Sequence, residues 1–181
     1  MRVLLEMARS GGIEALNIRS VALALGVSPR LIYTLVRDKE HMLALLTDEI
    51  LRDRMPDLSA ADWRTRLRNI AMAVQSAYRD YPGSAVFILS RSANRLEQPN
   101  ALRVRNAIFD ALEEAGLDKS WRDEMLILFS VIVLGNVVVA ESLPPDEHDM
   151  AMARARVEAA FGRGTDMLIQ AIESRSATGL A

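Results

Sequence analysis

The sequence predicts an all-α protein. Apolar residues recur at spacings of three and four, and residues that favour helices, chiefly Ala, Leu, Arg and Glu, fill the positions between them. The strict alternation of apolar and polar residues that is typical of strands is scarce. Gly and Pro interrupt the pattern where a glycine can end a helix or a proline cannot continue one. We therefore expect helices near residues 1–10, 18–25, 29–36, 39–55, 60–80, 84–96, 99–115, 120–142 and 147–174.

Two of these helix starts carry a hydroxyl followed three residues later by an acid. Ser59 precedes Asp62 in this way, and Ser120 precedes Asp123. This is the spacing of N-cap pairs that satisfy the unpaired amides of a first helical turn, so we expect the two serines to be N-caps.

Length and composition limit the class of protein. A chain of 181 residues that is half apolar can bury a sizeable core, as one large domain or two small ones. The absence of cysteine excludes disulfides, thiolate metal sites and cysteine nucleophiles, and it fits a reducing compartment. The first ten residues contain Glu6 and lack a signal-peptide pattern, so we expect a cytoplasmic protein. The apolar run 125–140 holds 16 uncharged residues, fewer than the ~20 that a membrane span requires, and predicts a buried helix.

Charge is distributed unevenly along the chain. Residues 1–39 hold six bases and three acids, a balance of +3, whereas the remainder holds 16 bases and 21 acids, a balance of −5. The formal net charge of −2 argues against a protein that coats nucleic acid generally. A basic segment at the front can still bind it locally.

The front segment contains two short helices with a tight turn between them. Asn17 is placed as the N-cap of the first helix, and Gly26 can end it in the left-handed conformation that reverses the chain. Val27 would fill the turn. The buried stripe of this helix is predicted to be Ile18, Val21, Ala22 and Leu25.

The second helix begins at once, because Ser28 is a strong N-cap and Pro29 suits the first helical position. Its inner face is predicted to be Ile32 and Val36, with help from Leu31 and Leu35. Its outer face is predicted to be Arg30, Tyr33, Thr34 and Arg37.

This outer face combines two cations, a phenol and a hydroxyl on a short helix held at a fixed angle, which predicts a helix-turn-helix that binds in a DNA major groove. Arginine can pair with guanine edges or phosphate, and the hydroxyls can bond phosphates or bases. Lys39 opens the next helix, where a backbone phosphate can sit. The alternative for Arg37 to Glu40 is a solvated helix cap.

The segment "GGIEALNIRSVALALGVSPRLIYTLVRDKEHMLALL", residues 11–46, resembles the DNA-binding domain of the tetracycline-repressor (TetR) family. The resemblance implies an N-terminal three-helix helix-turn-helix domain, residues 1–46, whose fourth helix continues to about 55. A C-terminal helical domain for ligand binding and dimerisation, residues 56–181, would follow. The resemblance assigns DNA contacts to Asn17, Arg19, Ser28, Pro29, Arg30, Tyr33, Thr34 and Lys39.

The chain departs from the family pattern in two places. Thr34, Leu35 and Val36 stand where the family carries a basic or polar residue, a histidine and an aromatic residue. Met1 falls near the beginning of the first helix, so the basic arm that often precedes it is missing. Either the natural start lies upstream or the protein binds DNA with less neutralisation of the backbone.

Two apolar helices near the end of the chain can pair with their two-fold mates in a four-helix bundle, so we expect a homodimer. The alternative is a monomer whose core closes over both helices. The expected interface residues are Ile132, Gly135, Val139, Val157, Phe161 and Leu168.

A ligand cavity needs an apolar wall with a few polar groups. Asn136 is the best polar candidate because it lies in the middle of an apolar run; Asn94 and Ser130 are others. Ordinary core packing explains the apolar members equally well. The expected pocket residues are Met72, Gln75, Phe87, Ser90, Phe109, Met125, Phe129 and Asn136.

We expect no enzyme, metal or cofactor. The chain has only His41 and His148, without a defined ligand spacing, and adjacent acids such as Glu113 and Glu114 diverge on a helix. We predict a homodimeric regulator, most simply a repressor, that binds a palindromic operator in double-stranded DNA and is released by a small molecule. A protein of the same fold that binds small molecules but not DNA is the first alternative, and a helical-bundle enzyme is the second.

Overall fold

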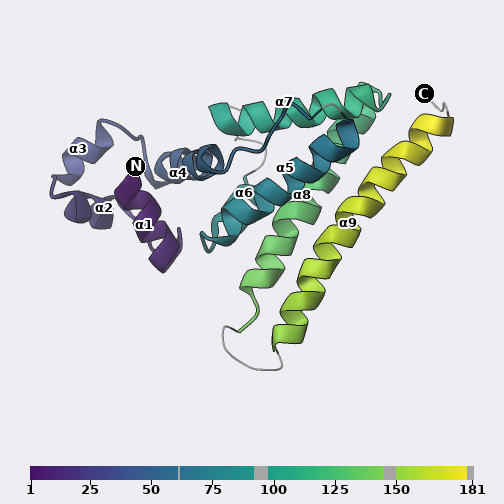
Figure 1. Ribbon diagram of the computed structural model, residues 1–181. Coiled ribbons are helices and arrows are strands. Elements are labelled where there is room, and N and C mark those ends of the chain that lie inside the picture. Colours follow the sequence, from purple (N-terminus) through teal and green to yellow (C-terminus); the bar gives the residue numbers. More distant parts are fainter. Residues whose placement is uncertain (61, 92–97, 145–149, 179–181) are drawn as a thin grey trace.

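The computed structural model describes residues 1–60, 62–91, 98–144 and 150–178, and throughout these ranges the regular structure is helical (Figure 1). The predicted all-α class is therefore confirmed. The elements are α1 (Arg2–Gly11), α2 (Ile18–Leu25), α3 (Pro29–Tyr33), α4 (Lys39–Asp53), α5 (Trp63–Arg79), α6 (Ser84–Leu89), α7 (Pro99–Glu114), α8 (Lys119–Glu141) and α9 (Met150–Thr178).

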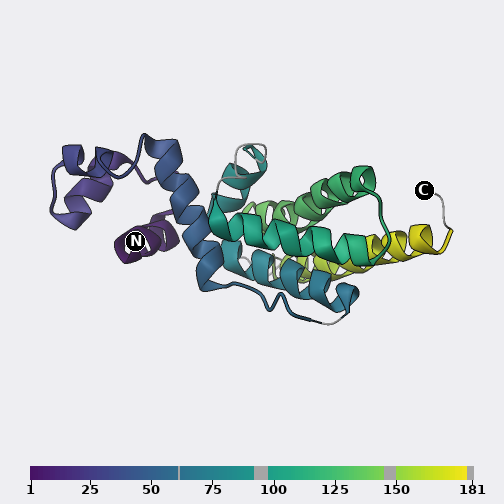
Figure 2. The ribbon, with the colours of Figure 1, turned by 90° about the horizontal axis from the view of Figure 1, so that it is seen from above.

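The helices form a small group, a connecting helix and a larger body. Helices α1, α2 and α3 lie together at one end, and α4 leads from them to the body built by α5 to α9 (Figures 1 and 2). Within the body, α8 packs against α5, α6, α7 and α9, while α4 packs on α5 and α7. Helices α8 and α9 run antiparallel beside each other, and the C-terminus lies far from α1 to α3.

The expected serine N-caps are wrong, because an aspartate directly before each helix takes the role. Asp62 accepts a hydrogen bond from the backbone N–H of Thr65 at 3.0 Å, and Asp118 does so from that of Trp121 at 3.1 Å. Ser59 instead donates to Asp57 at 2.6 Å. Aspartate caps as well as serine, and its charge also interacts favourably with the helix dipole. Helix α5 consequently begins three residues later than predicted.

Helix α6 also differs from its prediction, because it ends at Leu89 instead of continuing to 96. Asn94 and His148 lie outside the described residues. Helix α9 extends four residues beyond its predicted end at 174 and reaches Thr178.

Helix α8 is long and apolar enough to cross a membrane by length and composition. It is nevertheless a central helix of this fold, since it contacts four other helices of the body. Its inner face buries Met125, Phe129, Val133, Leu134 and Val137, whereas the rest of the helix is partly or fully exposed.

Candidate nucleic-acid interface

The turn between α2 and α3 has the predicted chemistry. The Asn17 side chain accepts a hydrogen bond from the Ser20 N–H at 2.9 Å, and the Ser20 hydroxyl accepts one from the Asn17 N–H at 3.1 Å. Gly26 ends α2 in the left-handed region, with φ 66° and ψ 30°, which residues with a Cβ rarely adopt. The Val27 N–H then donates to the Ala22 carbonyl at 2.9 Å and closes the turn. The angle between the two helices is thereby held by backbone hydrogen bonds.

Helix α3 is shorter than the predicted 29–36, although the helical winding continues beyond Tyr33. Ser28 caps the helix by accepting from the Leu31 N–H, and Pro29 occupies its first position. The N–H groups of Leu35 and Val36 both donate to the Ile32 carbonyl, at 2.9 and 3.0 Å. The backbone therefore remains approximately helical as far as Val36.

The outward face of α3 matches the prediction for its polar residues. Ile32 and Val36 are buried, whereas Arg30, Tyr33, Thr34 and Arg37 are exposed, Tyr33 by 57%. Among the described residues, the side chains of Arg19 and Arg30 form no ion pair, so both are available to an anionic partner.

The prediction that Leu31 and Leu35 help to cover α2 is wrong. Their exposed fractions are 50% and 72%, and Leu25, placed on the buried stripe of α2, is 40% exposed. A helix as short as α3 presents only a narrow strip to its neighbour, and Ile32 and Val36 fill it. Two leucines are left at the surface beside the cationic residues.

Two expected DNA contacts, Thr34 and Lys39, already hydrogen-bond within the chain. The Thr34 hydroxyl donates to the Leu31 carbonyl at 2.7 Å, and the Lys39 ammonium donates to the Glu14 carbonyl at 3.0 Å. Helix α4 is capped by Asp38, which accepts from the His41 N–H at 2.7 Å. Lys39 is exposed and held at the edge of the α2–α3 surface, with protons left for a further acceptor.

The turn before α6 fastens the front helices to the body. Arg9 of α1 donates to the Tyr81 hydroxyl at 2.9 Å and lies 5.1 Å from the centre of its ring. The Ile13 N–H donates to the Pro82 carbonyl at 2.9 Å. On the other side of this turn, the Gly83 N–H donates to the Glu141 carboxylate at 3.0 Å. The end of α8 is therefore linked to the α1–α2 connection through residues 81–83.

Glu141 is unusual in this linkage. Burial raises the pKa of its carboxyl above the ordinary value, although the hydrogen bond from Gly83 opposes the shift. Its second oxygen, Oε1, is buried and has no hydrogen-bond partner in the part of the chain that the structure describes.

Helix α4 is fastened to the body along its length. Asp48, which is buried, accepts hydrogen bonds from the backbone N–H groups that begin α7. The Tyr78 hydroxyl donates to the Thr47 carbonyl at 3.2 Å. At the end of α4 nearest α3, Arg91 pairs with Glu40 at 2.6 Å. Helix α4 is therefore joined to α5, to α7 and to Arg91 after α6.

The body contains a polar pair between α5 and α8, formed by buried Gln75 and partly buried Asn136. Gln75 of α5 donates to the Asn136 Oδ1 of α8 at 2.8 Å, and the Asn136 amide donates to the Val157 carbonyl of α9 at 2.7 Å. Phe87, Met125 and Phe129 are buried, and Phe109 is partly buried beneath the Arg105 guanidinium.

Met72 and Ser90 do not fit the predicted pocket, because both are exposed; Met72 is 63% exposed. Met72 lies three residues before Gln75 on α5. The Gln75 side chain is buried, whereas the Met72 side chain lies at the surface.

The expected interface residues divide between two faces. Phe161 and Leu168 are buried within the chain, and a Cβ at Gly164 would lie 3.3 Å from Ile132, so α9 packs closely against α8 at Gly164. Ile132, Gly135 and Val157 are partly buried, and Val139 is 51% exposed. The large apolar side chains left exposed on α8 and α9 are Ile127, Leu128, Val131, Val139, Met152 and Met167.

The linking residues Asp48, Glu141 and the Arg9–Tyr81 pair were not predicted from the sequence. Asp48 carries a signal that could have shown its role, since it is an acid at a buried position of the apolar pattern of α4. No cluster of three or more His, Cys, Asp or Glu side chains suited to a metal ion occurs in residues 1–60, 62–91, 98–144 and 150–178.

Comparison with known proteins supports the assignment of a helix-turn-helix followed by a helical body. No family model matches the chain. An HTH-type transcriptional repressor of Mycobacterium tuberculosis is 31% identical over 139 residues, which are 74% of this chain and 53% of the relative. The chain thus spans about half the length of the curated relatives it matches.

Solved structures cover almost the whole chain. A TetR variant from Acinetobacter baumannii, crystallised with minocycline, superposes with a TM-score of 0.80 at 24% identity, over 99% of this chain and 94% of that one. BioQ with its double-stranded DNA operator superposes with a TM-score of 0.74 at 20% identity, over 95% and 94% of the two chains. The helix-turn-helix at the front, the helical body behind it and these similarities identify the chain as a protein of the TetR-type regulator fold, related in sequence to HTH-type transcriptional repressors.

Proposed function

We propose that this protein is a ligand-responsive transcriptional regulator, most simply a cytoplasmic repressor, that binds a palindromic operator as a homodimer. The observation that carries the proposal is the outward face of α3, where Arg30 and Tyr33 are exposed on a helix whose angle is set by the Gly26 turn. Arg19 adds a second exposed cation at the start of α2. A rigid cationic face of this kind suits both phosphate and base contacts.

The relatives support this proposal. The Mycobacterium tuberculosis relative is named a repressor, BioQ was solved with its operator, and the TetR variant was solved with minocycline. We accordingly divide the chain into a DNA-binding domain, residues 1–46, and a ligand-binding and dimerisation domain, residues 56–181, with α4 between them.

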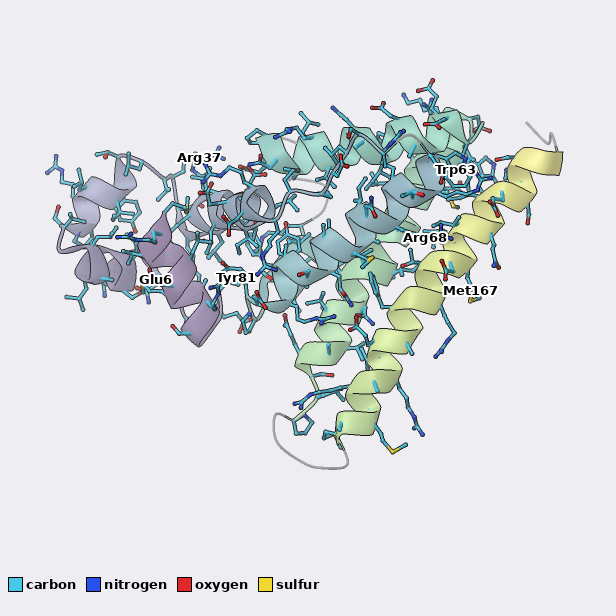
Figure 3. The ribbon with its side chains drawn as sticks, viewed as in Figure 1. Glu6, Arg37, Trp63, Arg68, Tyr81 and Met167 are labelled. Atoms are coloured by element: carbon cyan, nitrogen blue, oxygen red, sulfur yellow. The ribbon has the colours of Figure 1, made fainter. Side chains whose placement is uncertain are left out.

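The surface of α8 and α9 supports the proposed homodimer. Val131 and Ile127 lie one helical turn apart on α8 and are 54% and 64% exposed, and Met167 of α9 points away from the body (Figure 3). An exposed apolar surface on a long core helix is characteristic of an interface. Two α8–α9 pairs related by a two-fold axis would cover it and bring two copies of α3 to one face of the DNA.

The effector site is proposed in the body beside the Gln75–Asn136 pair, with Phe87 and Phe129 in its apolar wall. A ligand can change DNA affinity only by favouring one arrangement of the two recognition helices over the other. Helix α4 is the proposed lever, because Asp48 and Glu40 connect it to α7 and to Arg91 after α6.

The proposal is tested by binding of the full-length protein to the DNA upstream of its own coding region. We expect a specific complex that Arg30→Ala weakens, and release of that complex by at least one member of a panel of aromatic small molecules. Release should be lost in Asn136→Leu without loss of DNA binding. Failure to bind any DNA specifically, together with ligand binding in the body, would instead favour a small-molecule-binding protein of the same fold.

A further inference from the structure

Leu31 is an apolar side chain at the surface of the recognition helix. It lies in the first turn of α3, is 50% exposed, and is not among the partly buried residues that pack against the core. Its neighbour Arg30 is exposed and forms no ion pair with the residues that the structure describes, and Ile32 turns inward to fill the contact with α2. The Leu31 side chain therefore contributes little to the stability of the fold, although it is large and apolar.

The position of Leu31 decides what it can touch. In a helix-turn-helix the residues near the N-terminus of the recognition helix reach the base edges in the major groove. Leu31 is the third residue of α3, directly after Arg30. Leu35 is even more exposed, at 72%, but it follows the end of α3. Of the two leucines, Leu31 is the one placed to meet a base.

A leucine side chain can form no hydrogen bond, so it can distinguish bases only through apolar contact. The apolar group that base pairs present in the major groove is the C5-methyl of thymine. Burying this methyl against Leu31 removes both surfaces from water, whereas an exposed leucine against any other base edge desolvates a polar group without a partner.

We infer that Leu31 is a specificity-determining residue that contacts the C5-methyl group of a thymine next to the base read by Arg30. This inference rests on the proposed DNA-binding function and adds to it the chemistry of one operator position. Each half-site carries such a thymine, and its contribution comes from the methyl group and not from the hydrogen-bonding edge.

The experiment isolates that methyl group. The full-length protein is first used to enrich binding sequences from a random pool of double-stranded DNA. In the enriched operator each thymine is then replaced, one symmetric pair at a time, by deoxyuridine, which lacks only the methyl. Affinity is measured by fluorescence anisotropy for the natural protein, for Leu31→Ala and for Leu23→Ala. Leu23 is the control because it is 83% exposed on α2, outside the recognition helix.

We expect one thymine position at which deoxyuridine weakens binding about fourfold per half-site, the effect of one methyl-sized group. Leu31→Ala should bind the thymine operator about as weakly and show no further loss with deoxyuridine, while Leu23→Ala keeps the full difference. The inference is overturned if no thymine shows the effect, or if Leu31→Ala remains sensitive to it. If no sequence is enriched at all, the proposed function fails and the inference falls with it.

Discussion

Asp48, in the middle of α4, caps the N-terminus of α7. Its carboxylate accepts hydrogen bonds from the backbone N–H groups of Asn100 and Ala101, at 3.1 and 2.8 Å, and from the Asn100 side chain at 2.7 Å. Gln98, the residue at the N-cap position of α7, makes no side-chain capping bond. The connecting helix thus supplies the cap that α7 lacks, and the two helices are joined by a buried charge.

Replacing Asp48 by alanine should lower the free energy of unfolding by about 3 kcal/mol, because a charged hydrogen-bond acceptor is lost and the amides at the start of α7 are left unpaired. Urea denaturation at neutral pH measures the change. The matched control is Asp118→Ala, which removes an ordinary exposed N-cap from α8 and should cost about 1 kcal/mol. Equal losses in the two variants would show that the Asp48 bonds add nothing beyond a surface cap.

Replacing Arg30 by alanine should weaken specific DNA binding by ~1–3 kcal/mol if its guanidinium contacts a base edge, and preference at one operator position should relax. Stability should stay unchanged because the side chain is exposed. Arg103→Ala, which removes an exposed arginine of α7, is the control and should bind as the natural protein does. A loss that is uniform over all sequences would make Arg30 a phosphate contact.

Replacing Val131 by aspartate should convert the protein to a monomer, because a charge placed in a proposed apolar interface loses its hydration without a partner. Sedimentation velocity measures the state directly. Leu23→Asp introduces the same charge at an exposed leucine of α2 and should remain dimeric. A dimer that survives Val131→Asp would place the interface elsewhere.

The Glu141 carboxyl predicts a pH dependence of stability. Its folded-state pKa is raised by burial, so the folded protein binds this proton more tightly than the unfolded chain. The stabilising contribution is complete below the ordinary pKa of 4.5 and is lost as the pH rises through the folded value. Glu141→Gln, which can still accept from the Gly83 N–H, should therefore gain stability relative to the natural protein as the pH rises.

The measurement is the difference in free energy of unfolding between the two proteins from pH 4.5 to 8. A difference that does not change with pH would show that the carboxyl ionises alike in the folded and unfolded chains. Glu141 joins α8 to the turn at Gly83. Comparing the natural protein with Glu141→Gln therefore also measures how much this link contributes to the free energy of unfolding.

The helix pair α2–α3 was predicted well from the sequence, because the residues that cap and separate these helices lie within a few positions of each other. Asn17, Gly26, Ser28 and Pro29 each act on their own turn, and the structure places them as predicted. The error at Leu31 arose from helical periodicity, which assigns faces but not the width of the surface that a neighbour covers.

The body was less predictable because its contacts join distant residues. Periodicity identified Phe161 and Leu168 as one apolar stripe of α9, but both side chains are buried within this chain, where α9 packs against α8 and α5. The roles of Asp48 and Glu141 likewise depend on Asn100 and Gly83, which no local pattern connects to them.

Hydroxyl-radical footprinting of the full-length protein on its enriched operator tests the central claim most directly. Two copies of α3 related by a two-fold axis should protect two patches on one face of the duplex, about 34–36 Å apart, and Arg30→Ala combined with Tyr33→Ala should abolish both patches while leaving the fold intact. Protection that persists in the doubly substituted protein, or that covers one continuous stretch without a two-fold pattern, would contradict the account.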